Sequence, residues 1–221
     1  MSKKKPVTAR VKIDDQRILN ACRAYSKWKD LNNIVKQEST RGINMPDCIS
    51  EIMGCWIYDF LWNRGSEVGD AYDPKTNRKI EFKATSNYEG DLSTFGPETT
   101  FDNLIFLRFD IDRDMLYSYD LNVNSEEFNE FPVSSTETVG DWKKAGKRPH
   151  IRLLETIIEP NNIEPDIVFD IIAREITEDH RREEKIKPVP IVIERKQRKS
   201  KAKASTVVVH SSTIVFGSDE D

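Results

Sequence analysis

The sequence predicts an α/β domain in which a central mixed sheet is flanked by helices. Three observations predict this class: helical spacing of apolar residues in the first 65 residues, short turn-bounded segments of strand-forming residues after them, and a further helical pattern near residue 170. With 221 residues and 37% hydrophobic content, the chain is long enough for one domain with a substantial core. We place this domain at residues 14–184, between a basic leader at 1–13 and a low-complexity, disordered basic tail at 185–221.

Two helices are expected before the sheet. Apolar residues recur every three or four positions over residues 14–37, which predicts an amphipathic helix. Pro46 and Asp47 are typical of a helix start, so a second helix is expected from there to about Gly65. The apolar residues of this second helix occupy one wide face, and Glu51 therefore falls toward its flank.

The hydrophobic period then changes to that of strands. Residues 67–72 and 79–84 have the pattern of two short strands. The turn between them contains Pro74 and Asn77, so the two strands are expected to form a hairpin. Residues 103–109 are apolar enough for a buried central strand.

The remaining segments are less regular. A further strand is expected at 115–121 and another at 151–158, with a polar, irregular stretch between them. Residues 165–184 carry apolar side chains at helical spacing, which predicts a last helix. Beyond residue 185 the bias toward Pro, Lys and Arg favours disorder, although residues 206–209 suit an edge strand.

The charge distribution and the cysteine pattern limit the classes of function that fit this chain. The net charge is −4, but residues 181–203 hold ten Lys or Arg against three Glu, so the rest of the chain is acidic. Charge alone neither supports nor excludes nucleic-acid binding, because metal ions offset clustered carboxylates. The three cysteines form no CxxC pair and the three histidines are scattered, which argues against structural zinc. No apolar run is long enough to span a bilayer or follows the basic start, so we expect a cytoplasmic protein without membrane contact.

The most informative segment runs from Gly69 to Lys83. Asp70 lies on the first strand of the expected hairpin, while Glu81 and Lys83 share one face of the second. The turn brings Asp70 alongside Glu81. Two carboxylates at that separation repel each other unless a cation lies between them, and oxygen ligands with open positions suit Mg²⁺. We therefore expect Asp70 and Glu81 to bind Mg²⁺, with Lys83 facing the same substrate phosphate.

These residue types meet the needs of phosphodiester hydrolysis. The metal ion supplies an activated water and neutralises phosphoryl charge, while the Lys83 ammonium positions or deprotonates the water and stabilises developing charge. Glu51 is a candidate further ligand, either directly, through a water, or at a second metal ion. The alternative is that the Glu-x-Lys pattern is a solvated strand face and that Glu51 is an ordinary surface residue.

The order of these features resembles the PD-(D/E)XK nuclease superfamily, and within it the type II restriction endonucleases. The resemblance covers about residues 45–160 and includes Ile49-Ser50-Glu51, Glu81-Phe82-Lys83 and Thr94-Phe95-Gly96-Pro97. It implies that Asp70 and Glu81 bind magnesium and that Lys83 assists the water. Gly69 stands where the superfamily's name has Pro, at a position that varies widely among its members.

Two loops are candidates for DNA binding. The loop that follows Lys83 contains polar side chains suited to base edges or phosphates, namely Ser86, Asn87, Tyr88 and Thr94. A second segment concentrates cations suited to phosphate or guanine, namely Lys147, Arg148 and Arg152. An ordinary basic loop is the alternative for this second segment.

These observations together predict a magnesium-dependent endonuclease that cleaves double-stranded DNA at a short specific site. A homodimer is expected because two-fold symmetry matches palindromic DNA, and a DNA methyltransferase is the implied functional partner. Two alternatives remain open: a structure-selective repair or recombination nuclease of the same fold, and a noncatalytic DNA-binding protein.

Overall fold

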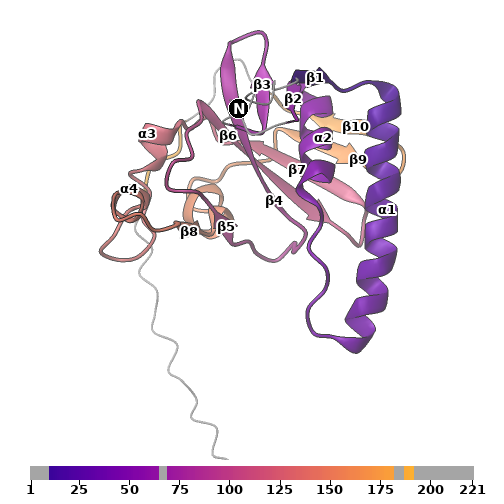
Figure 1. Cartoon of the computed structure of the whole chain (residues 1–221), viewed down its shortest axis with the longest axis horizontal. Coiled ribbons are helices and arrows are strands. Elements are labelled where there is room, and N and C mark those ends of the chain that lie inside the picture. The colour runs from indigo at the N-terminus through magenta and orange to yellow at the C-terminus, as the bar shows by residue number, and fades with distance from the viewer. Residues whose placement is uncertain (1–9, 65–68, 182–186, 192–221) are drawn as a thin grey trace, which may run out of the picture.

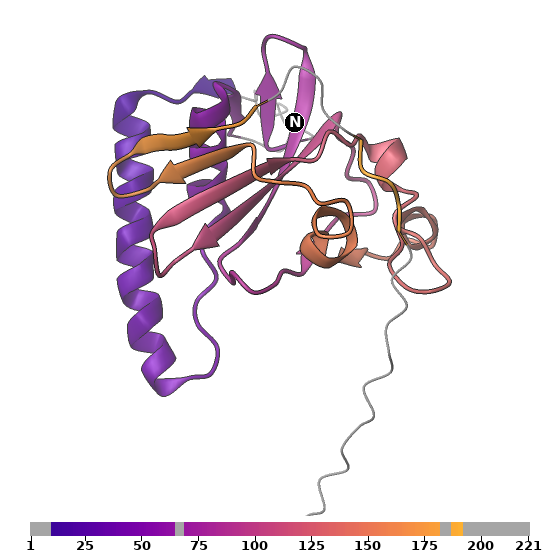
Figure 2. The same ribbon diagram turned by 180° about the vertical axis from the view of Figure 1, so that it is seen from behind.

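An eight-stranded mixed sheet organises the molecule, for which we analysed a computed structural model (Figure 1). The structure describes residues 10–64, 69–181 and 187–191. The strand order is β1-β2-β3-β4-β6-β7-β9-β10, and a separate two-stranded ribbon pairs β5 with β8. Helices α1 and α2 cover one face, and Figure 2 shows the other face, with the β9–β10 hairpin (orange) at one end and shorter helices at the other. The predicted fold class is confirmed.

The two N-terminal helices form as expected, with one corrected boundary. Helix α1 spans Asp15–Glu38, and the Asp14 carboxylate caps it by accepting the Arg17 N–H at 2.8 Å. Helix α2 spans Asp47–Tyr58 and does not continue to Gly65. It ends because Asp59 adopts a left-handed conformation (φ 61°), and the chain turns directly into strand β2, Leu61–Asn63.

The predicted hairpin is present, but Asp70 lies directly before its first strand and not on it. Strand β3 spans Ala71–Asp73 and pairs antiparallel with β4, Arg78–Thr85. Asn77 takes a positive φ of 62° in the turn, a conformation that Asn tolerates well. Outside it, β2 pairs with β3, and β1, Arg10–Lys12, pairs with β2. Part of the segment expected as a leader is thus a strand of the sheet.

Strand β6, Asn103–Asp110, is the buried central strand that its apolar sequence predicts. It runs parallel to β4 and antiparallel to β7, Met115–Asp120. Its side chains alternate between two cores, as strand geometry requires. Ile105, Leu107 and Phe109 face α1 and α2, and Leu104 and Phe106 belong to the core on the opposite face.

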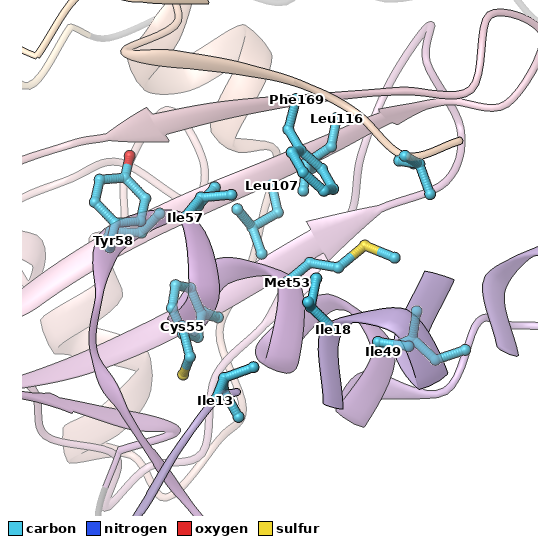
Figure 3. Close-up of a cluster of buried hydrophobic side chains, with 14 of the residues drawn as sticks. Ile13, Ile18, Ile49, Met53, Cys55, Ile57, Tyr58, Leu107, Leu116 and Phe169 are labelled. Atoms are coloured by element: carbon cyan, nitrogen blue, oxygen red, sulfur yellow. The ribbon is translucent and has the colours of Figure 1, made fainter. Parts of the chain in front are cut away.

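The first core joins helices α1 and α2 to the sheet. Figure 3 shows Ile18 and Met53 from the helices directed toward Leu107, Leu116 and Phe169 of the strands. Met53, Leu107, Leu116 and Phe169 are fully buried. This close packing gives the sheet a rigid support on one side.

The expected last helix over 165–184 is wrong. Residues Ile167–Asp170 form strand β9, and Glu175–Asp179 form β10, which pairs with it. The Asp170 carboxylate accepts two backbone N–H groups of the intervening turn, and Arg174 takes a positive φ of 62°. Three consecutive apolar residues buried on both faces of a sheet imitate half of a helical pattern, which explains the error.

Two further expectations are corrected between β7 and β9. The stretch 122–150 was expected to be irregular, but it contains two short helices with capping boxes, α3 at Ser125–Phe128 and α4 at Val139–Lys144. The strand expected over 151–158 is limited to β8, His150–Ile151, which pairs with β5, Ser93–Thr94. A π-helical turn, η1 at Leu154–Ile158, follows and packs in the second core.

The described part of the predicted tail contacts the domain. Val189 donates its backbone N–H to the Asn161 side chain at 2.9 Å, and Pro188 is buried. The edge strand considered at residues 206–209 lies outside the described residues. None of the helices that the structure describes is long and apolar enough to cross a membrane.

Candidate active site

The hairpin places Asp70 directly beside Glu81. The Asp70 N–H donates to the Ile80 carbonyl at 2.9 Å, and the Phe82 N–H donates to the Asp70 carboxylate at 2.8 Å. The Asp70 side chain therefore lies against the segment of β4 that contains Glu81. The arrangement expected from the sequence is present.

Asn63 on β2 fixes the backbone that carries Asp70. Its side-chain amide donates to the Gly69 carbonyl at 3.0 Å, and its backbone N–H donates to the Asp70 carbonyl at 3.0 Å. Gly69 has a φ of +88°, which an L side chain rarely adopts. This backbone conformation gives a physical reason for Gly directly before Asp70.

Glu81 and Lys83 share a face of β4. The Lys83 ammonium donates to the Glu81 carboxylate at 2.7 Å, and it lies 4.8 Å from the centre of the Phe95 ring. Glu81 is only 7% exposed. Between them, Phe82 points to the opposite face, where it packs against Gly54 of α2 so closely that an added Cβ would lie 2.7 Å from its ring.

Glu51 approaches the same centre from α2. The Trp62 indole N–H donates to its carboxylate at 2.7 Å. Burial raises the pKa of Glu51, the Trp62 hydrogen bond lowers it, and the charges of Asp47 and Glu81 raise it. The sequence analysis missed this contact, because nothing in the strand pattern of Trp62 marks an indole that reaches back to the preceding helix.

The electrostatics show that the three carboxylates are neighbours. The pKa of Asp70 is raised to about 7 by burial first, then by the negative charges of Glu81 and Glu51, against the Phe82 hydrogen bond and the Lys83 charge. A bound cation would favour the ionised form of a carboxyl whose pKa is raised in this way. The centre therefore favours binding of a positive ion.

The donor set suits a hard divalent cation with an incomplete protein shell. Carboxylate oxygens are the ligands that Mg²⁺ prefers, and this ion normally keeps several waters beside one or two carboxylates. In the described residues, no three His, Cys, Asp or Glu side chains are arranged as a ready-made metal cage. Asp70 and Glu81 fit an open site in which water and substrate oxygens supply the remaining ligands.

The structure brings the two candidate DNA-binding segments together. Strand β5 pairs with β8, and the Thr94 hydroxyl is 2.9 Å from Nδ1 of His150. The Asp91 carboxylate also accepts the N–H groups of Leu153 and Leu154 at 2.9 and 3.1 Å. The loop after β4 and the basic segment therefore form one surface beside the hairpin.

The cations of the basic segment differ in their surroundings. Arg148 is exposed, and the Lys147 ammonium lies 5.6 Å from the centre of the Trp142 ring. Arg152 forms an exposed ion pair with Glu155 at 3.1 Å. This surface pair is weak enough to exchange for a phosphate contact.

Ser86, Asn87 and Tyr88 line a groove of about 1300 Å³. Tyr88 is held in place by the Arg108 guanidinium, which stacks 3.7 Å from its ring centre. The opposite wall comes from α1 and the α1–α2 loop and contributes polar side chains that the sequence analysis did not select: Asn32, Lys36, Arg41 and Asn44. Asn32 anchors this wall by accepting the Ile43 N–H at 2.8 Å.

Comparison with known proteins assigns the class to which this chain belongs. The protein is a type II restriction enzyme, a site-specific deoxyribonuclease. More narrowly, the chain belongs to the Bsp6I restriction endonuclease family, which it matches over residues 13–160. It is 42% identical over 166 residues to the type II restriction enzyme Bsp6I of Bacillus sp. (strain RFL6), covering 75% of this chain and 95% of that enzyme.

The family match includes the whole candidate centre. Glu51, Asp70, Glu81 and Lys83 all lie within residues 13–160, as do both candidate DNA-binding segments. No solved structure matches this chain significantly.

Proposed function

We propose that this protein cleaves double-stranded DNA at a short specific site with Mg²⁺, using a PD-(D/E)XK centre of Asp70, Glu81 and Lys83. The single observation that carries the proposal is the convergence of these groups on the hairpin. The Asp70 carboxylate is fixed by the N–H of Phe82, and the two neighbours of Phe82 form the 2.7 Å Lys83–Glu81 contact. Two carboxylates and an ammonium at one place match the needs of metal-assisted phosphodiester hydrolysis.

Each residue has a distinct role in the proposed reaction. Asp70 and Glu81 would hold the metal, which when bound lowers the pKa of a coordinated water and neutralises phosphoryl charge. Lys83 exchanges its contact with Glu81 for the attacking water and the phosphoryl oxygen, and stabilises the charge that develops there. Glu51, oriented by Trp62, would serve as a further ligand of the metal, either directly or through a water.

DNA recognition is assigned to the surface beside the hairpin. Lys147, Arg148 and Arg152 contact phosphates. Ser86, Asn87 and Tyr88 lie on the loop that leaves β4 after Thr85, and Thr94 lies on strand β5 further along the chain. Polar side chains placed there read base edges while the cations fix the register of the duplex.

The biological setting follows from this activity. A homodimer would present two centres to the two strands of a palindromic site. A DNA methyltransferase of the same specificity would protect the host, and both proteins would act in the cytoplasm. The homodimer and the methyltransferase partner are proposed because the protein is proposed to cleave unmodified DNA.

The direct test is cleavage of unmethylated plasmid and phage DNA by the purified protein, in Mg²⁺ and in EDTA. We expect discrete fragments in Mg²⁺ only, and sequencing of the fragment ends should return one short recurring sequence. A magnesium-dependent smear or nick would instead favour a structure-selective nuclease. DNA binding without any cleavage would contradict the proposal.

A further inference from the structure

A second lysine approaches the hairpin from α4, 60 residues further along the chain. The Lys143 ammonium donates a hydrogen bond to the Thr99 carbonyl at 2.9 Å. Thr99 also accepts the Gly96 N–H with its hydroxyl at 3.1 Å. Gly96 directly follows Phe95, the ring beside the Lys83 ammonium. Lys143 is therefore connected to the catalytic strand through one short loop.

The support of Lys143 is rigid. The Thr138 hydroxyl and the Asp141 carboxylate cap α4 reciprocally. Val139 is fully buried and donates its N–H to the Phe131 carbonyl at 2.9 Å. The N–H of Gly140 donates to the Asn129 carbonyl at 2.9 Å, so closely that a Cβ at Gly140 would lie 3.1 Å from the Asn129 side chain. This packing fixes the point from which the Lys143 side chain extends.

The ammonium of Lys143 is partly buried without a close counter-charge. Burial lowers its pKa, and the charges that oppose this effect are those of Glu81 first and Glu98 second. In the described part of the chain no carboxylate lies within ion-pair distance of Lys143, and its one hydrogen bond goes to a neutral carbonyl. Two of the three ammonium donors remain for another acceptor.

A partly buried ammonium with spare donors, within the field of the metal-binding carboxylate Glu81, is suited to an anion that arrives with the substrate. We propose that Lys143 contacts a phosphate of the bound DNA next to the scissile one. This inference rests on the proposed function. It adds to the hairpin a cation from a distant element, which the Thr99 carbonyl holds in position before DNA binds. Lysine binds phosphate as a point charge, so the contact requires the ammonium and not a particular geometry.

The test separates charge from structure. Lys143→Gln keeps a side-chain amide that can donate to the Thr99 carbonyl but removes the positive charge. Lys144→Gln is the matched control, because Lys144 is the exposed neighbour on the same helix. The measurement is the salt dependence of binding, in EDTA, to a 30-bp duplex containing the site mapped by end sequencing.

One lost phosphate contact should reduce the slope of log affinity against log salt by about 0.9. We expect this reduction for Lys143→Gln, a wild-type slope for Lys144→Gln, and a restored slope for Lys143→Arg. A wild-type slope for Lys143→Gln, with or without a lower melting temperature, would overturn the proposal and leave Lys143 a structural role.

The outcome is distinguishable from failure of the proposed function. If the wild-type protein cleaves no DNA, the same salt titration on a pool of mixed-sequence 30-bp duplexes still asks whether Lys143 meets a phosphate. A slope change there would support the contact although cleavage failed. An unchanged slope would contradict it independently of catalysis.

Discussion

The two faces of the sheet differ in what covers them. One face is covered by the long helix α1 and by α2, with a continuous apolar core that includes Met53 and Leu107. The other is covered by short helices, a two-stranded ribbon and loops, and it carries Glu81, Lys83 and Lys143. The helix-covered face therefore supports the hairpin, while the other carries the residues proposed for catalysis.

The largest loss of cleavage is expected from a change at a proposed metal ligand. Glu81→Gln keeps the size of the side chain but removes a proposed metal ligand and several kcal/mol of transition-state stabilisation. Cleavage should fall by roughly three orders of magnitude, and the heat of Mg²⁺ binding should diminish in calorimetry. Glu98→Gln, an exposed carboxylate on the loop between β5 and β6, is the control. Equal Mg²⁺ affinity in the two variants would argue against Glu81 as a ligand.

A core substitution on the supporting face should lower stability and spare the chemistry. Met53→Ala removes a fully buried side chain and should cost about 2–5 kcal/mol of unfolding free energy in urea titrations. The rate of cleavage at saturating DNA should stay near that of the wild type at a temperature where the variant is folded. Ile34→Ala, at a side chain 60% exposed, should change stability by less than about 0.5 kcal/mol. Loss of cleavage in folded Met53→Ala would contradict the inference that the helix-covered face only supports the hairpin.

Trp62 links the helix-covered face to the candidate site, because its indole holds Glu51 of α2. Trp62→Phe removes only the indole N–H that holds Glu51, and should reduce cleavage or Mg²⁺ affinity by about 10-fold. Trp142→Phe removes a similar indole hydrogen bond, to Glu137 at 3.1 Å, and serves as the control. If both variants cleave alike, the hydrogen bond from Trp62 to Glu51 has no part in the reaction.

The last prediction concerns the dependence of stability on pH. The pKa of Asp70 rises from 3.8 to about 7 on folding, so between these values the folded protein binds more protons than the unfolded chain. The free energy of unfolding in EDTA should therefore fall as pH rises through this window. Asp70→Asn should flatten that fall in urea titrations at successive pH values. A wild-type slope in the variant would contradict the assignment.

The sequence predicted the supporting face and the hairpin more accurately than the C-terminal part. Helix α1, the β3–β4 hairpin and strand β6 follow from local periodicity and turn residues. The β9–β10 hairpin was mistaken for a helix because its turn depends on the Asp170 side chain and on a positive φ at Arg174. A turn held by a side chain and a positive φ cannot be read from the spacing of apolar residues.

The residues of the candidate site also divide into those that the sequence predicts and those that it does not. Asp70, Glu81 and Lys83 could be selected because spacing and strand alternation are local properties. Trp62 and Lys143 could not, since their contacts with Glu51 and Thr99 depend on tertiary packing across 11 and 44 residues. A contact of that kind becomes visible only when the elements that carry it are placed.

The most direct test of the proposed catalytic centre is the single-turnover rate of double-strand cleavage, compared between Lys83→Ala and Lys79→Ala. Both lysines lie on β4, but Lys83 contacts Glu81, whereas Lys79 is exposed near the start of the strand. We predict that Lys83→Ala loses roughly 10³-fold or more in rate while it remains folded and binds DNA, and that Lys79→Ala cleaves like the wild type. A folded Lys83→Ala variant that cleaves at the wild-type rate would contradict the proposed catalytic role of Lys83.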